Sequence, residues 1–238
     1  MAPKNQPDAN HDKKIVVQKN GPYLVYGDIP LVRKAAVVSE YGEPITWKKG
    51  EVIETSGPYE LCRCGRSGNK PFCDNTHEKI GFDGTESADT RITAERRVTL
   101  AGGKQIVVQR DYSLCMEAGF CGNRFANIPK MVADTADTRV RSLVIAMIER
   151  CPSGSYTYSI EEGEADIEPD LPQQIAVTTE MTDDGPIIGP LWVTGDIPIE
   201  RSDGQPFETR NRVTLCRCGL SKTKPLCEGT HRALGIKE

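Results

Sequence analysis

The sequence predicts an α+β fold in which two small β-rich modules flank a third unit that mixes helix and strand. Two observations carry this prediction: a set of three cysteines and one histidine occurs twice, and a similar strand-forming segment precedes each copy. The boundaries that follow are a disordered polar tail over 1–14, a first module over 15–92, a middle unit over 93–165 and a second module over 166–238.

The repeated set keeps the same spacing in both copies. The stretch CRCGRSGNKPFCDNTH places Cys62, Cys64, Cys73 and His77 at offsets 0, 2, 11 and 15, and CRCGLSKTKPLCEGTH does the same with Cys216, Cys218, Cys227 and His231. A glycine after the second cysteine relaxes the turn, so that both thiolates can reach one metal ion. The last cysteine and the histidine share a face if a helix begins there. Each set thus offers two ligand pairs, which suits a two-iron cluster. A single tetrahedral zinc ion is the alternative, although zinc ligands are usually spaced more widely.

Both stretches resemble the CDGSH (NEET) iron–sulfur motif, C-x-C-x2-S-x3-P-x-C-D-G-S-H. The resemblance implies that each set binds a [2Fe–2S] cluster through three cysteines and one histidine. Asn75 stands where the family has Gly and Glu228 where it has Asp, and neither is a ligand. Asn tolerates a positive φ, so Asn75 can replace the glycine. The hydroxyl groups expected to donate to the cluster sulfurs, with ordinary turn and cap bonding as the alternative, are those of Ser67, Thr76, Ser221 and Thr230.

A strand precedes each motif. GPYLVYGDIPL (Gly21–Leu31) and GPLWVTGDIPI (Gly189–Ile199) read as the same strand ending in a turn, and further strands are expected over Glu51–Leu61 and Glu208–Leu215. The connection Val32–Gly50 carries no assignment. A unit of this size buries little apolar surface alone. Proteins resembling this family commonly build a β-cap from two copies, so we expect an internal pseudo-dimer within a monomer.

The middle unit has a different pattern. It predicts a hairpin over Arg96–Gln109, a strand over Ser155–Ile160, and between them a helix whose apolar stripe is Val140, Leu143, Val144, Met147 and Ile148. Cys115 and Cys121, followed by the helix and Cys151-Pro-Ser-Gly, resemble the divergent single-cluster [4Fe–4S] ferredoxin family. The resemblance implies a third cluster, [3Fe–4S] or [4Fe–4S], on these three cysteines. Glu117, which replaces a family histidine, is a further candidate ligand. A vestigial domain without a cluster is the alternative, and the acidic segment Glu161–Asp170 is expected to be a solvated hinge.

Composition reduces the number of function classes that the sequence allows. Thirty basic and 34 acidic side chains argue against general binding of nucleic acid or anionic membranes. The longest apolar run, Leu143–Ile148, is too short to span a bilayer. Nine cysteines without an export signal favour the cytoplasm. Arg63 and Arg217 are interpreted as a docking rim for an acidic partner or as solvated surface charge.

We therefore expect a one-electron carrier with a redox protein partner rather than an enzyme, since no nucleotide loop, flavin site or nucleophile triad is present. Two alternatives stay open. One is a carrier that delivers clusters to an apo iron–sulfur acceptor, or a redox or pH sensor, with labile histidine-ligated iron. The other is a zinc-binding structural adaptor.

Overall fold

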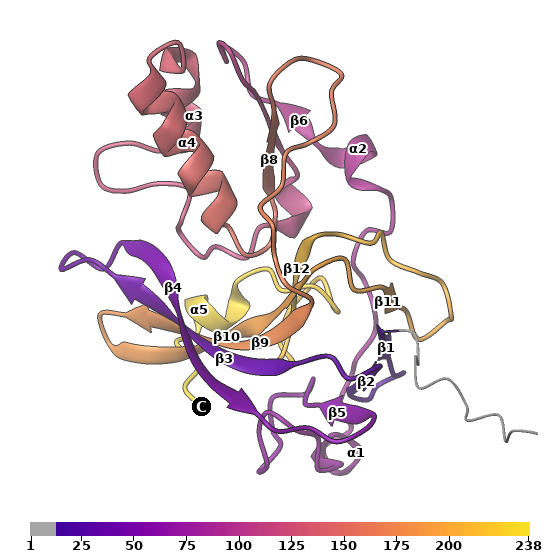
Figure 1. Cartoon of the computed structure of the whole chain (residues 1–238). Coiled ribbons are helices and arrows are strands. Elements are labelled where there is room, and N and C mark those ends of the chain that lie inside the picture. The colour runs from indigo at the N-terminus through magenta and orange to yellow at the C-terminus, as the bar shows by residue number, and fades with distance from the viewer. Residues whose placement is uncertain (1–12) are drawn as a thin grey trace, which may run out of the picture.

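The computed structural model describes residues 13–238 (Figure 1). Most of the expected polar tail over 1–14 lies outside these residues, and the first strand already begins at Lys14. Three β-sheets and a few helices make up the described part of the chain, as an α+β fold requires. None of the helices within 13–238 has the length and apolar character needed to cross a membrane.

Two sheets form the lower part of the molecule. The four-stranded sheet has the order β11-β1-β2-β5 and the five-stranded sheet the order β12-β10-β9-β3-β4. From the first module come β1 (Lys14–Val17), β2 (Tyr23–Tyr26), β3 (Leu31–Val38), β4 (Pro44–Ile53) and β5 (Tyr59–Leu61). From the second come β9 (Gln174–Thr182), β10 (Gly185–Thr194), β11 (Ile199–Glu200) and β12 (Arg212–Leu215).

The two modules exchange strands. After its GDIP turn, each module sends the next strand to the sheet of the other: β3 pairs in parallel with β9, and β11 pairs in parallel with β1. The turns are alike, since Gly27, Asp28, Gly195 and Asp196 all adopt positive φ. The exchange joins the modules through backbone hydrogen bonds in both sheets.

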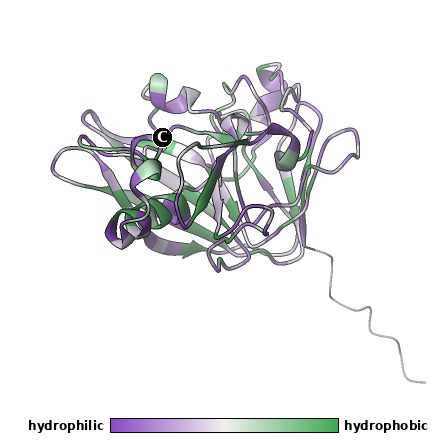
Figure 2. Ribbon diagram, turned by 90° about the horizontal axis from the view of Figure 1, so that it is seen from above, coloured by the Kyte–Doolittle hydropathy of each residue, from purple (hydrophilic) through white to green (hydrophobic). Residues whose placement is uncertain are grey.

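A single apolar core lies between these sheets. Ile15, Val25 and Leu61 of the first module and Ile175 and Leu215 of the second belong to one cluster, and each is at most 1% exposed. Figure 2 shows the apolar strands inside and the polar loops around them. Burial of strands from both modules in one core explains why neither module needs a large core of its own.

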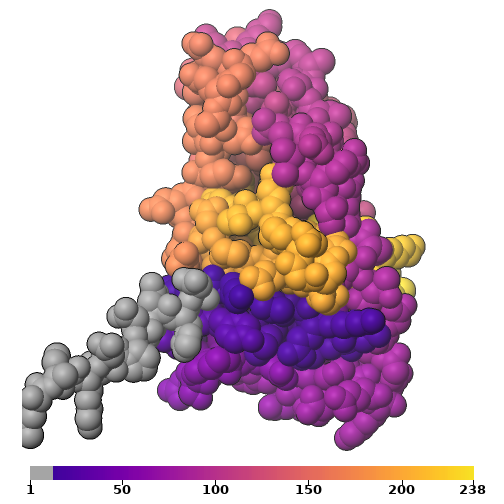
Figure 3. Space-filling view, turned by 90° about the vertical axis from the view of Figure 1, so that its right-hand side faces the viewer, coloured from indigo at the N-terminus to yellow at the C-terminus, as the bar shows by residue number. Residues whose placement is uncertain are grey.

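The middle unit stands on the other two as a separate lobe (Figure 3). Its sheet has the order β6-β7-β8, with β6 (Val98–Thr99), β7 (Val107–Arg110) and β8 (Tyr156–Ser159). Its helices are α2 (Thr93–Arg96), α3 (Ile128–Met131) and α4 (Thr138–Arg150), with 3₁₀ turns at Tyr112–Leu114 and Val132–Asp134. Its own apolar core includes Val108, Val144, Ile148 and Tyr156.

Several expectations need correction. The strand expected over Glu51–Leu61 is broken after Ile53, and the unassigned connection Val32–Gly50 lies largely in the hairpin of β3 and β4. Leu143 is 41% exposed and lies off the buried face of α4. The segment Glu161–Asp170 is not a free hinge, because Asp166 pairs with Arg97 at 2.5 Å and Glu168 with Arg212 at 2.9 Å.

Both arginines assigned to the surface are also buried. Arg63 is 1% exposed and donates to the carbonyl oxygens of Gln18 and Gly84, at 3.1 and 2.5 Å. Arg217 is 5% exposed and donates to those of Gly189 and Thr178, at 2.7 and 2.9 Å. Each arginine comes directly after a cysteine in the sequence, and its side chain points into the protein. The local sequence does not predict the distant carbonyl oxygens to which it donates.

Candidate metal centres

The repeated ligand residues come together in two places. We call Cys62, Cys64, Cys73 and His77 the first site and Cys216, Cys218, Cys227 and His231 the second site. In the first, the Sγ atoms of Cys62 and Cys64 are 3.8 Å apart and Cys73 Sγ is 3.3 Å from His77 Nδ1. In the second, the corresponding distances are 3.6 and 3.4 Å. Two thiolates on one tetrahedral metal ion, with bonds of about 2.3 Å, lie about 3.8 Å apart. Each pair therefore has the spacing of ligands to a common metal ion.

In both sites the cysteine and histidine side chains lie in pairs rather than in larger groups. Across residues 13–238, no three His, Cys, Asp or Glu side chains converge closely enough to hold one metal ion. The pairs of one site are still neighbours, because the charge of Cys62 acts on Cys73 and that of Cys216 acts on Cys227. This donor set fits a group larger than a single ion.

The backbone around each site has a left-handed residue before a one-turn helix, and some of its N–H groups point at the cysteine sulfurs. Asn75 has φ 63° and Gly229 has φ 94°, so Asn75 adopts the left-handed conformation expected of it. One-turn helices follow, α1 (Thr76–Lys79) and α5 (Thr230–Ala233), and carry the two histidines. Backbone N–H groups point at sulfur: that of Arg66 lies 3.5 Å from Cys64 Sγ, and that of Asn75 lies 3.4 Å from Cys73 Sγ.

The hydroxyl groups make other bonds. Ser67 Oγ donates to the carbonyl oxygen of Phe72, and Ser221 Oγ to that of Leu226, each at 2.7 Å. Thr230 bonds to the carboxylate of Glu228, and Thr76 to that of Asp74. The hydroxyls thus order the ligand loops, while the hydrogen bonds to sulfur found here come from the backbone.

Burial is the main influence on the pKa values of most of these thiols. It raises the pKa of Cys64 and Cys73, and it raises the pKa of Cys227 well above its ordinary range. Cys216 differs, since the hydrogen bond from Cys218 lowers its pKa to about 6. Ligand thiols must lose their protons to bind a metal, so binding here releases protons.

The two CxC loops touch each other. Gly65 has φ 74° and lies against the backbone of Cys218, while Gly219 has φ 80° and lies against the backbone of Cys64. A methyl group on either glycine would overlap the carbonyl group it faces. The first and second sites are therefore connected directly through their own loops.

The second site is the more deeply buried. Cys227 and His231 are each 2% exposed, whereas Cys73 and His77 are partly exposed. The first module also holds the loop of the second site: Tyr23 Oη donates to the carbonyl oxygen of Cys216 at 2.7 Å, and the backbone N–H groups of Ser87 and Ala88 donate to that of Lys224.

The remaining cysteines form a third group, the middle site. Cys115, Cys121 and Cys151 line one small cavity of about 30 Å³, next to Tyr156. Burial raises the pKa of Cys121, and the charges of Cys151 and Cys115 add to the effect. A guanidinium nitrogen of Arg110 lies 3.8 Å from Cys115 Sγ. Glu117 lines the same cavity but is exposed, with φ 60°.

The loop of the middle site packs on the second site. Met116, Ala118 and Phe120 form an apolar cluster with Cys227, and Trp47 packs beside it with its ring 5.3 Å from that of Phe120. Glu117 lies against Gly229. Two cysteine-bearing loops thus meet at Cys227.

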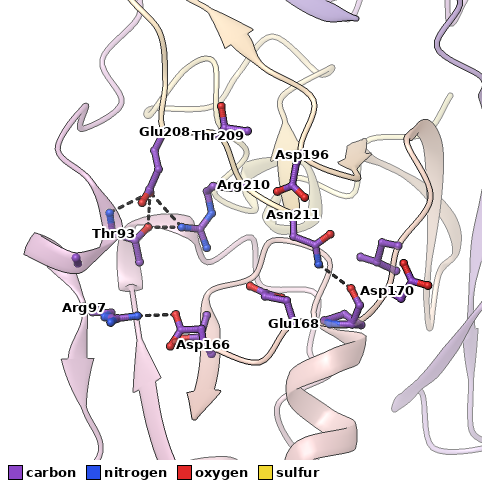
Figure 4. A pocket seen from close by; sticks show the side chains of 14 residues that line it. Thr93, Arg97, Asp166, Glu168, Asp170, Asp196, Glu208, Thr209, Arg210 and Asn211 are labelled. Atoms are coloured by element: carbon purple, nitrogen blue, oxygen red, sulfur yellow. Dashed lines mark hydrogen bonds and ion pairs between the residues drawn. The ribbon is translucent and has the colours of Figure 1, made fainter. Parts of the chain in front are cut away.

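A larger cavity, of about 500 Å³, lies where the middle unit meets the second module (Figure 4). Its polar side chains bind one another: Arg97 pairs with Asp166, and Glu208 accepts from the hydroxyl of Thr93 and from Arg210. Asn211 donates to the carbonyl oxygen of Pro169 at 2.9 Å. No cysteine or histidine lines this cavity, so its side chains join the two units rather than complete a metal site.

Comparison with known families bears on the outer modules. Residues 20–78 and 188–232 match the family model of the iron-binding zinc finger of CDGSH type. Two segments of the chain, together less than half of its length, thus match one family of iron-binding CDGSH domains. Such domains bind iron–sulfur clusters, so the two matches support iron–sulfur binding by the chain. A search of curated proteins found no match. The middle unit lies outside both matched ranges, so its ferredoxin-like character stays a prediction.

Sequence reasoning missed the residues that surround the histidines. Nε2 of His231 lies 2.9 Å from Oε1 of Glu180, and Glu180 is 2% exposed. The signal available was a single carboxylate within the apolar strand QIAVTTEMT, on the face that also carries Ala176 and Thr178. Buried carboxylates need a partner, which would have marked Glu180 for attention.

Proposed function

We propose that the protein is a one-electron carrier with a [2Fe–2S] cluster in the first site, a second in the second site and a third cluster, [3Fe–4S] or [4Fe–4S], in the middle site. The observation that carries the proposal is the contact between neighbouring loops. Gly65 and Gly219 join the first and second sites, and Met116 and Phe120 join the second and middle sites. Contiguous centres suit the passage of electrons through one chain.

Paired ligands support clusters over zinc. A tetrahedral zinc ion needs four ligands around one point, whereas these residues lie in pairs, each with the spacing of two ligands on one metal ion. The exchange of strands supports the internal pseudo-dimer, because each module completes the sheet of the other. A bound cluster supplies one-electron redox chemistry, and the chain supplies thiolates, imidazoles and N–H groups directed at sulfur.

The test is the content of iron, sulfide and zinc in protein purified without air, with absorption and electron paramagnetic resonance (EPR) spectra. About four irons per chain would mean filled outer sites, and seven or eight would mean that the middle site is filled too. Cys121→Ala should then lower the content by three or four irons and leave the outer spectra unchanged. Zinc without sulfide would overturn the proposal.

A second candidate function is delivery of clusters to an apo iron–sulfur protein. The partial exposure of Cys73 and His77 favours it, because an acceptor can approach ligands that are open to solvent. Rates of cluster transfer to an apo-ferredoxin, compared with rates of electron transfer from a reductase, separate the two. We expect electron transfer to be faster than cluster transfer.

A further inference from the structure

The histidines of the two sites have different surroundings. Oε1 of Glu180 lies 2.9 Å from Nε2 of His231, and its other oxygen lies 2.8 Å from Nη1 of Arg232. Within residues 13–238, Nε2 of His77 has no hydrogen-bonding partner. Instead, His77 lines a hollow of about 590 Å³ together with the turn residues Lys19, Asn20 and Gly21.

One difference between the two hairpins explains this asymmetry. Gln18 and Thr178 are equivalent, since Arg63 donates to the carbonyl oxygen of Gln18 and Arg217 to that of Thr178. In the first module the chain turns at once after Gln18 and returns at Pro22. In the second, β9 and β10 continue beyond Thr178 to a distant turn, and Glu180 pairs with Ile187 in this extension. The extension covers His231, and its absence leaves His77 beside a hollow.

The carboxylate also selects the tautomer of His231. Glu180 is paired with Arg232 and is therefore an acceptor, so Nε2 of His231 carries the hydrogen. Nδ1 then keeps its lone pair and faces Cys227 Sγ at 3.4 Å, on the ligand side. A hydrogen bond of this kind fixes the ring and makes the histidine a stronger ligand.

We propose that Glu180 is a positioning residue that retains the cluster of the second site, so that the second site keeps its cluster while the first exchanges or loses its own. The inference rests on the proposed function, because both sites must bind clusters. Two consequences follow. The second site loses its cluster more slowly, and its reduction potential is lower, because a histidine that donates to a carboxylate is a stronger electron donor to the oxidised cluster.

The test uses the full chain with its clusters, prepared without air and exposed to an iron chelator. Loss of each cluster is followed by absorption and EPR, and potentials are measured by redox titration. His77→Cys changes the spectrum of the first site and so assigns the signals. In the wild type we expect two phases, the faster from the first site. Glu180→Ala should speed loss from the second site about 10- to 100-fold, in line with the effect of removing partners of metal ligands, without changing the first.

Two further variants separate positioning from folding. Glu180→Gln keeps the shape and removes the charge, so it should raise the potential of the second site even if Glu180→Ala folds poorly. Asp184→Asn removes a charge from the exposed tip of the same hairpin and should change neither rate nor potential. Equal rates of loss from both wild-type sites, or an unchanged second site in both Glu180 variants, would overturn this inference alone. A wild-type protein without iron and sulfide would overturn the proposed function and this inference together.

Discussion

The first and second sites share the spacing of their cysteines and histidine, the shape of their loops and a buried arginine between their first two cysteines. They differ in what surrounds the cysteine–histidine pair. The cysteine–histidine pair of the second site is covered by the β9–β10 hairpin and by Phe120 of the middle unit. The same pair in the first site meets solvent and a hollow. Duplicated motifs therefore do not have duplicated surroundings, since segments outside the motif decide how far each cysteine–histidine pair is covered.

The contact of the two CxC loops is the feature that the sites share most closely. Breaking it should have the largest effect on the clusters, because it should reach both sites. Gly65→Ala or Gly219→Ala must place a methyl group against a carbonyl group at a positive φ. We expect a loss of about 2–5 kcal/mol in the free energy of unfolding, from strain and overlap together. Either change should also weaken cluster binding at both sites. Thermal unfolding and iron content check this.

Gly57→Ala is the matched control, because Gly57 also has a positive φ, 58°, but no atom lies within 4 Å of the added methyl group. It should cost only the strain of the backbone, about 1–2 kcal/mol. If Gly65→Ala cost no more than Gly57→Ala and left the second site intact, the two loops would not be coupled.

Removing the cover of the second site should have the next largest effect on the clusters, because it should reach one site rather than two. Phe120 is 4% exposed and packs with Cys227, so Phe120→Ala leaves a cavity that costs about 3–5 kcal/mol. Loss of iron should become faster at the second site and stay unchanged at the first. Phe125→Ala, at a side chain that is 80% exposed, should change stability by less than about 0.5 kcal/mol. Equal acceleration at both sites would show that Phe120 does not distinguish them.

The meeting of the repeated cysteines and histidines in pairs was predictable from sequence, because it depends on short spacing. A CxC turn and a four-residue step fix which donors meet, and Asn75 took the positive φ expected of a glycine substitute. The surroundings were not predictable, because they come from distant segments. Tyr23 reaches the carbonyl group of Cys216, and Glu180 reaches His231, across strands that exchange between modules. Local periodicity carries no information about such pairings, and for the same reason it placed Arg63 on the surface.

The smallest expected effect concerns the carboxylate of Glu238, which lies beside Arg217. The described contacts of Arg63 include no equivalent carboxylate. Glu238 lies 2.9 Å from Arg217. Burial alone would raise the pKa of Glu238, but the charge of Arg217 and the hydrogen bond to it outweigh burial and hold the pKa below its ordinary value of 4.5. A carboxyl group whose pKa is depressed by folding stabilises the protein above its ordinary pKa, and this contribution is lost as the pH falls through the depressed value.

Glu238→Gln should therefore lower the free energy of unfolding at pH 7 by about 0.5 kcal/mol or less, since the pair is partly exposed and screened by solvent. The difference from the wild type should shrink below pH 4.5 and vanish once Glu238 is protonated. Unfolding by denaturant at several pH values measures it. Glu51→Gln, in an ion pair whose carboxylate side chain is 70% exposed, serves as the control. A difference that persisted unchanged in acid would mean that the carboxylate acts through packing, and the electrostatic distinction between Arg63 and Arg217 would not hold.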